Sequence, residues 1–345
     1  MDHIGIDLGG RESQVCIRTS DGVLTYEGRV ATTSLPEFLR RAAGRVVLET
    51  CAEAFAIADA ALDLGHEVRV VPATLVRVLG VGARGLKTDR RDAQALSEAS
   101  CRIDLPSVHV PSRWSREVKS MCGMRESLVQ ARTRLVNTIR GWLRGQLKGS
   151  GLRLGGPVAI PKKMRAYFES QQLEVPAFVL RQLETIDLLS EQIKEANQEL
   201  EALAKGSDLC QRLMTVPGVG PLTSLRFVSA IDRIDRFKNA HQLESYLGLT
   251  PGEDSSSDRR RITSITKAGN ASARWILVQA AWCALRTRAR HPMCEWAREV
   301  ARRRGTFKAI AALARKIAGI LYALWRDGTR YEPFYRLEPT VAASA

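Results

Sequence analysis

The sequence predicts an α/β domain at the N-terminus, then a long helical segment and a mostly helical C-terminal part. Residues 3–30 alternate apolar and polar positions with the period of strands, and residues 45–71 follow the pattern strand, helix, strand. From residue 113 onward, apolar residues recur mainly at helical spacing. We therefore expect three parts in the 345 residues, at 1–110, 111–205 and 206–345.

The N-terminal pattern predicts a mixed sheet. Asp21-Gly22 stands between two strand patterns, which is a strong hairpin signal. The later strands are separated by a helix, as in a crossover connection, and this order suits a sheet whose central strand is the first. The expected elements are strands at 3–8, 14–18, 23–29, 45–49 and 66–71, with a helix at 52–64.

Four carboxylates stand where such a sheet would present them. Asp7 and Glu49 lie at the ends of the first and fourth predicted strands. Asp89 and Asp92 are three residues apart in a helix that Thr88 can cap, so they share one helical face. Acids are also favoured in any first helical turn, and the spacing leaves that interpretation open. The four residues offer the oxygen ligands that one or two Mg²⁺ ions prefer, with Mn²⁺ as the alternative.

A strongly basic helix is predicted over residues 113–150. Nine Lys and Arg residues are balanced there by two acids, and Trp114 and Trp142 are interleaved with them. Contact with phosphates is the favoured role, and a solvated surface helix is the alternative. The residues expected to bind nucleic acid are Arg132, Arg134, Arg140 and Arg144.

Glycine and proline become frequent in residues 151–177, which predicts an irregular linker. Beyond it, Ile186, Ile193 and Leu200 repeat every seven residues beside a second apolar series. This pattern predicts a coiled-coil arm that joins protomers into a homodimer or homotetramer. An intramolecular helical hairpin would give the same pattern.

Two motifs in the C-terminal part indicate phosphate binding. The turn at residues 216–221, between two helical patterns, resembles the hairpin of a helix-hairpin-helix module, in which backbone amides meet a phosphate. Further on, three serines directly precede a cluster of arginines, so hydroxyl groups stand beside an anion-binding segment. The serines could be nucleophiles or part of a loop that grips the backbone. The residues concerned are Gly218, Gly220, Ser255, Ser256, Ser257, Arg259, Arg260, Arg261 and Lys267.

The net charge of +15 is segregated along the chain. Residues 1–110 carry −2, 111–150 carry +7, 151–250 are neutral and 251–345 carry +10. Charge that served only solubility would be more evenly spread, so DNA or RNA is the expected partner and acidic lipid the weaker alternative. No apolar run is long enough to span a bilayer, and seven scattered cysteines include no C-x-x-C pair. We expect a cytoplasmic protein associated with the nucleoid when bound to DNA.

The motifs occur in a family-specific order. Asp7, Glu49 and the D-x-x-D-A of residues 89–93 are followed by PGVGPLTS, then GLTPGEDSSS and ITKAGNASAR. In this order the chain resembles the DEDD transposases and recombinases of the insertion sequence 110 family, which are related to pilin gene invertases. The stretches ETCAEAF and RTRLVNTIRGWL are most similar to the insertion sequence 1111 subgroup.

The resemblance implies an RNase H-like domain of the Holliday-junction-resolvase type, with Asp7, Glu49, Asp89 and Asp92 as its metal-binding tetrad. It also implies a nucleophilic serine, assigned to Ser256 with Ser255 as second choice, that forms a covalent phosphoserine link to donor and target DNA. Family members are thought to be guided by a structured noncoding RNA and to complete the site across protomers. This chain has Ala52 at a position where the family often has Gly. Glu53 is the alternative to Glu49 as the second residue of the tetrad.

Other functions remain as alternatives. A resolvase-like nuclease would use water as the nucleophile and leave the serines idle. A nucleic-acid-binding protein without catalysis would need none of the acids. The stretch GIDLGG also occurs in actin-like sugar kinases, but a second phosphate loop is missing and the basic C-terminal half is ill suited to a sugar.

Overall fold

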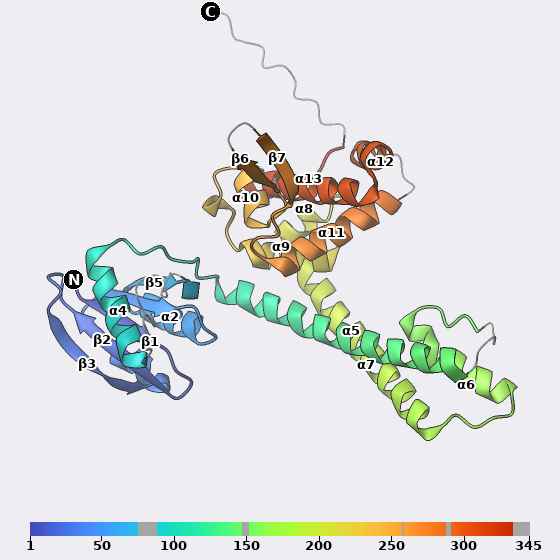
Figure 1. The fold of residues 1–345 in the computed structure, drawn as a ribbon, viewed down its shortest axis with the longest axis horizontal. Helices are drawn as coiled ribbons and strands as arrows, with labels where there is room; N and C mark the ends of the chain where they lie inside the picture. The colour runs from blue at the N-terminus through green and yellow to red at the C-terminus, as the bar shows by residue number, and fades with distance from the viewer. Residues whose placement is uncertain (75–87, 147–151, 257–258, 288–290, 334–345) are drawn as a thin grey trace, which may run out of the picture. The chain divides into compact units, whose positions relative to one another are not determined.

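The structure, a computed structural model, describes residues 1–345 except 75–87, 147–151, 257–258, 288–290 and 334–345. The chain forms two compact units, Met1–Pro111 and Ser112–Ala345 (Figure 1). The division after Pro111 lies one residue from the boundary expected at 110. The described part of 112–345 clusters as one unit, so a further division at 205 stays a prediction.

Unit 1 contains a five-stranded mixed sheet in the order β3-β2-β1-β4-β5. β1 is central, antiparallel to β2 and parallel to β4, which confirms the order expected from the sequence. Thr88 caps α4 as expected, because its hydroxyl accepts a hydrogen bond from the Arg91 amide. The elements are β1 (His3–Asp7), β2 (Glu12–Arg18), β3 (Leu24–Ala31), α1 (Leu35–Phe38), β4 (Arg45–Glu49), α2 (Ala54–Asp63), β5 (Glu67–Val71) and α4 (Asp89–Arg102).

Alternation along the strands divides the core of unit 1 between two faces. Ile4 and Ile6 of β1 are fully buried in one cluster with Ile57 of α2. Val47 of β4 belongs to a separate cluster with Leu96 of α4. Because successive side chains point to opposite faces of a strand, α2 and α4 cover different faces of the sheet.

Unit 2 begins with two long helices that pack on each other, α5 (Arg113–Gln146) and α7 (Ala177–Lys205). Val118 near the start of α5 shares a core cluster with Leu200 near the end of α7. Val136, further along α5, shares another with Ile186. The helices are therefore antiparallel, and the heptad residues of α7 are buried within the chain. The intramolecular hairpin, which was the alternative interpretation of the sequence, accounts for the seven-residue repeat of α7. That protomers join through this hairpin stays a prediction.

The segment between α5 and α7 corrects the expectation of an irregular linker. Residues Ile160–Ser170 form the helix α6, which buries Met164 and Phe168. Pro161 stands in the first turn, where the missing amide hydrogen costs no hydrogen bond. The prolines therefore start a helix here, after the short turn η3 (Pro157–Ala159), and do not mark a linker.

The rest of unit 2 is a helical body with one small hairpin. Leu225, Phe227, Leu313 and Leu321 are buried in its core. The described residues of the serine–arginine segment, up to Ser256 and from Arg259 onward, lie on two antiparallel strands. The elements are α8 (Asp208–Leu213), α9 (Pro221–Ile231), η4 (Ile234–Arg236), α10 (Ala240–Tyr246), β6 (Pro251–Ser256), β7 (Arg259–Ile265), α11 (Ala271–Arg286), α12 (Pro292–Arg304) and α13 (Thr306–Asp327).

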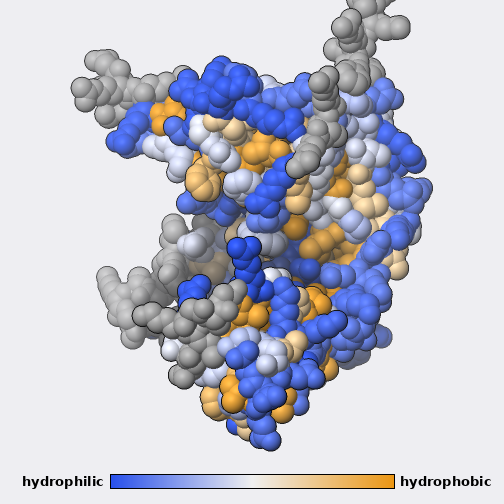
Figure 2. Space-filling view, turned by 90° about the vertical axis from the view of Figure 1, so that its right-hand side faces the viewer, coloured by the Kyte–Doolittle hydropathy of each residue, from blue (hydrophilic) through white to orange (hydrophobic). Residues whose placement is uncertain are grey.

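The described helices include no stretch long and apolar enough to cross a membrane. On the face drawn in Figure 2, hydrophobic residues lie in separate areas among hydrophilic ones. Exposed apolar side chains on α7 include Phe178 and Leu188, at 54% and 62% exposure. Single exposed apolar residues of this kind are normal on protein surfaces.

Candidate active site

Two of the four predicted carboxylates end neighbouring strands. Ile6 of β1 pairs with Leu48 of β4, so the next residues, Asp7 and Glu49, stand side by side at the carboxyl edge of two parallel strands. Both side chains are partly buried. The sheet thus presents Asp7 and Glu49, the first two residues of the predicted tetrad, at one edge.

The second pair is carried by α4, which approaches β1 closely at Gly5. A Cβ atom on Gly5 would lie 2.4 Å from the Ala93 carbonyl oxygen and 2.5 Å from the Ser97 amide nitrogen. Only glycine permits this distance between strand and helix. Asp92, which precedes Ala93, is 1% exposed, while Asp89 is exposed. The first turn of α4 therefore has one acid inside the unit and one at its surface.

Glu27 of β3, which is separated from β1 by β2 in the sheet, also holds the start of α4. Its two carboxylate oxygens accept hydrogen bonds from Arg90 and Gln94, each at 2.5 Å. The bond from Arg90 lowers the pKa of Glu27, so the contact holds the charged form. The helix that carries Asp89 and Asp92 is consequently fastened to β1 and to β3.

A polar cleft of about 550 Å³ opens beside these elements, lined by Arg11, Gln14, Arg29 and Asp89 among others. Gln14 is the strand partner of Asp7. Carboxylates are the donors that hard divalent cations prefer, so the tetrad fits such an ion by its chemistry. Within the described residues, however, no three His, Cys, Asp or Glu side chains are grouped closely enough to hold a metal ion.

The predicted nucleophile lies in unit 2, on strand β6. In the β6–β7 hairpin, Ser256 pairs with Arg259 and Ser255 with Arg260. The side chains of these four residues, and Ser257 as a whole, lie outside the described part of the chain. Arg261 is exposed and pairs with Asp254. Antiparallel pairing thus sets serines opposite arginines that are up to five positions away in the sequence.

Packing gives a structural reason for one glycine of the predicted phosphate turn. Gly218 has a φ of +86°, and a Cβ atom on it would lie 2.2 Å from the Ala280 carbonyl oxygen of α11. Gly220 meets nothing within 4 Å and caps α9 with extended backbone. Gly218 is thus required by the core, and phosphate binding by the backbone of Gly218 and Gly220 stays a prediction.

The arginines of α5 divide into two groups. Arg132 is partly buried and donates a hydrogen bond to the Ser190 hydroxyl of α7 at 3.2 Å, and burial lowers its pKa. Arg140 donates to the Gly155 carbonyl at 2.8 Å. Arg134 and Arg144 are exposed. Two of the four predicted contacts with nucleic acid therefore belong to residues that also stabilise the helical hairpin.

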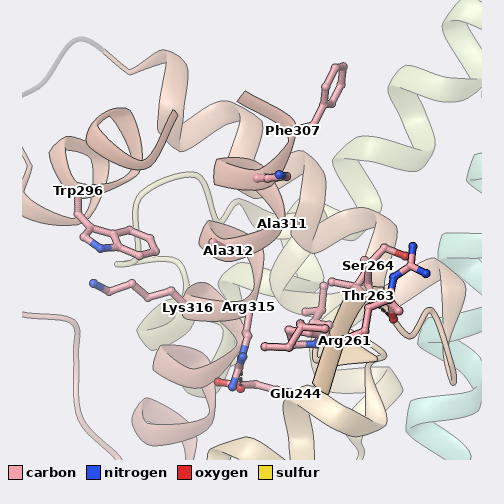
Figure 3. Close-up of a pocket in the computed structure, with 15 residues that line it drawn as sticks. Glu244, Arg261, Thr263, Ser264, Trp296, Phe307, Ala311, Ala312, Arg315 and Lys316 are labelled. Atoms are coloured by element: carbon pink, nitrogen blue, oxygen red, sulfur yellow. Dashed lines mark hydrogen bonds and ion pairs between the residues drawn. The ribbon is translucent and has the colours of Figure 1, made fainter. Parts of the chain in front are cut away.

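The structure adds a cavity of about 910 Å³ that the sequence did not predict. It lies between β7, α12 and α13, and its lining includes Trp296, Lys316 and Arg261 (Figure 3). One signal was present in the sequence: aromatic residues stand among the basic ones of the stretch EWAREVARRRGTFK. Its three-dimensional arrangement with the hairpin could not be read from that stretch.

The families and known proteins to which this chain is similar are transposases. A DEDD model of IS110 transposases, described as "Transposase", matches residues 4–147, and one described as "Transposase IS116/IS110/IS902 family" matches residues 210–293. The chain is 29% identical to the transposase for insertion sequence element IS1111A of Coxiella burnetii, over 93% of the chain and 88% of the relative. It is 30% identical to the "Probable family 20 transposase" of Pseudomonas aeruginosa, over 96% and 99%. It is 26% identical to the transposase for element IS1328 of Yersinia enterocolitica, over 94% and 97%.

Proposed function

Since the chain belongs to the IS110 family of DEDD transposases, we propose that it cuts and rejoins the DNA of an insertion sequence through a serine nucleophile assisted by a divalent metal. In this proposal unit 1 is an RNase H-like domain, and Asp7, Glu49, Asp89 and Asp92 are its ligands. Ser256 is the nucleophile and Ser255 the second choice.

One observation carries the proposal. Asp7 and Glu49 end adjacent parallel strands, and the helix with Asp89 and Asp92 is held against the first of those strands at Gly5. Four carboxylates from three elements of one small domain are thus kept on a rigid frame. Such a frame suits ligands that must keep their geometry while charge develops on a phosphate.

The chemistry of the step follows from the residue types. The Ser256 hydroxyl oxygen attacks the phosphorus, the bond from phosphorus to one deoxyribose oxygen breaks, and the proton lost by the serine ends on that oxygen. When bound, Mg²⁺ or Mn²⁺ would neutralise the phosphate and lower the pKa of the attacking hydroxyl. The arginines of β7 supply positive charge beside the serines. The phosphoserine ester keeps the energy of the phosphodiester bond for rejoining the strands, whereas attack by water would lose that energy.

The test is the fate of a DNA strand that contains an element end. Wild-type protein with Mg²⁺ is expected to form a protein–DNA adduct that survives denaturing electrophoresis, and Ser256→Ala is expected to lose it. Ser255→Ala is the matched control, because it removes the same atom one position away. If Ser256→Ala cleaves the strand as well as wild type does and still forms the adduct, Ser255 is the nucleophile. If cleavage is retained and neither wild type nor Ser256→Ala forms an adduct, water is the nucleophile and the serine mechanism is wrong.

A second arm of the experiment concerns the acids. Asp92→Asn is expected to reduce cleavage by at least 100-fold, because one metal ligand is lost. If wild type and Asp7→Ala bind the DNA equally well and neither cleaves it, a binding protein without catalysis is favoured instead. RNA guidance and oligomerisation are separate parts of the proposal: sequencing of nucleic acid that copurifies with the protein tests the first, and its mass in solution tests the second.

A further inference from the structure

The cavity between β7, α12 and α13 suits a ligand that combines a flat apolar group with a charged group next to it. Its volume of about 910 Å³ lies within the usual range for small-ligand sites. Ala311 and Ala312 of α13 form its floor, and their short side chains leave that floor open. Figure 3 shows Trp296 and Lys316 on one side of it and Arg261, Thr263 and Ser264 on the other.

Trp296 is 36% exposed, and the Lys316 ammonium lies 4.4 Å from the centre of its ring. The ammonium lies over one face of the indole, so a base would stack on the other face, with its phosphate within reach of the ammonium. Phe307 also contributes to the lining and is 84% exposed, but its ring points away from Trp296 and meets the Trp282 ring edge-on.

The charge of the lining indicates an anionic occupant. Among the described lining residues Glu244 is the acid, and Arg315 donates a hydrogen bond to it at 2.5 Å. Arg261, Lys308 and Lys316 then contribute the net positive charge of the rim. An apolar surface with a basic rim complements a nucleotide, which combines an apolar face with a phosphate.

The position of the cavity connects it with the serine hairpin. Arg261, in its wall, is two residues along β7 from Arg259, the partner of Ser256. Two strand residues span about 7 Å, close to two base steps of a DNA strand. The wall of the cavity at Arg261 is therefore close to the strand partner of Ser256, and a base stacked near Trp296, on the opposite side, would belong to a nucleotide farther along the same DNA strand.

We propose that this cavity binds an unpaired base of the DNA strand, stacked near Trp296 with its phosphate at Lys316. This inference rests on the proposed function, because it takes DNA as the ligand. The inference adds a binding preference to the proposed function. The protein binds a DNA duplex with an extrahelical base more tightly than a fully paired duplex.

The binding test uses the full-length protein without divalent metal, so that no cleavage occurs. Fluorescein-labelled 30-base-pair duplexes, fully paired or with one unpaired adenine, are titrated at fixed salt and followed by anisotropy. Wild type is expected to bind the bulged duplex about tenfold more tightly, the factor typical for stacking of one base on an aromatic side chain. Trp296→Ala is expected to abolish the preference and leave affinity for paired duplex within about twofold.

Two variants control for misfolding. Trp275→Ala removes a tryptophan of similar exposure, 43%, that does not line the cavity, and should keep the preference. Ala312→Leu fills the cavity from its floor while Trp296 and all charges stay, and should lose the preference. Equal preference in wild type and Ala312→Leu would overturn the inference even if Trp296→Ala failed to fold.

Other outcomes separate the possible occupants. If the same bulge in RNA is bound more tightly than in DNA, the commitment to DNA is wrong. If Trp296→Ala and Ala312→Leu change only the mass of the protein in solution, the cavity serves another copy of the chain, which also overturns the inference. Adduct formation by Ser256 is measured separately, so a missing preference beside a normal adduct contradicts this inference alone.

Discussion

The close contact at Gly5 yields the sharpest prediction about the candidate active site. In Gly5→Ala, the added Cβ atom would lie 2.4 Å from the Ala93 carbonyl oxygen, where ordinary contact begins at 3.4 Å. The helix α4 must therefore withdraw from β1 by about 1 Å. Since the obstructing atoms belong to the backbone, no side-chain rotation can relieve the clash.

Both stability and activity should respond. Overpacking of this kind costs about 1–3 kcal/mol, which urea unfolding of the full chain measures through the midpoint of the first transition. The same 1 Å moves Asp89 and Asp92 away from Asp7 and Glu49, and a misplacement of that size can cost about 100-fold in rate. Strand cleavage in the presence of Mg²⁺ measures the second effect.

A matched control is available in the same unit. Gly10→Ala adds the same atom where nothing lies within 4 Å, so stability should change by less than about 0.5 kcal/mol. If Gly5→Ala unfolds at the wild-type midpoint and cleaves at the wild-type rate, α4 does not position the tetrad. That result would refute the reasoning, whatever Gly10→Ala does.

Three other predictions concern packing and titration. Gly218→Ala should destabilise unit 2 by about 2 kcal/mol or more, because it combines a positive φ with a backbone clash, whereas Gly220→Ala should leave thermal unfolding nearly unchanged. Arg226 is 6% exposed and donates to Ser272, the Cys122 carbonyl and Glu126, so Arg226→Ala should cost about 3 kcal/mol in urea, and a loss below about 1 kcal/mol would contradict a structural role. Burial lowers the pKa of His3 below 6.5, so the unfolded chain binds its proton first as the pH falls; the free energy of unfolding should drop from pH 7.5 to 5.5, and a drop just as steep in His3→Gln would speak against this.

The sequence predicted most of unit 1 from local patterns. Strand alternation, the Asp21-Gly22 turn and the crossover order placed β1 at the centre of the sheet, and the Thr88 cap placed Asp89 and Asp92 in one turn. These features depend on residues close together in the chain, which is why periodicity and turn chemistry suffice for them. The ordered motifs likewise sufficed to indicate the family, which the comparisons then showed.

Long-range contacts decided what the sequence left open or had wrong. The partner of the α7 heptads within the chain is α5, which lies far from them in the sequence, and Ile186 and Leu200 are buried in core clusters that α5 shares. Whether protomers also meet through this hairpin stays a prediction. Antiparallel pairing of β6 with β7 sets Ser255 and Ser256 opposite arginines of β7. Trp296 became part of a cavity because α12, α13 and β7 meet in space. A linear pattern shows which faces are apolar, and only the fold determines what covers them.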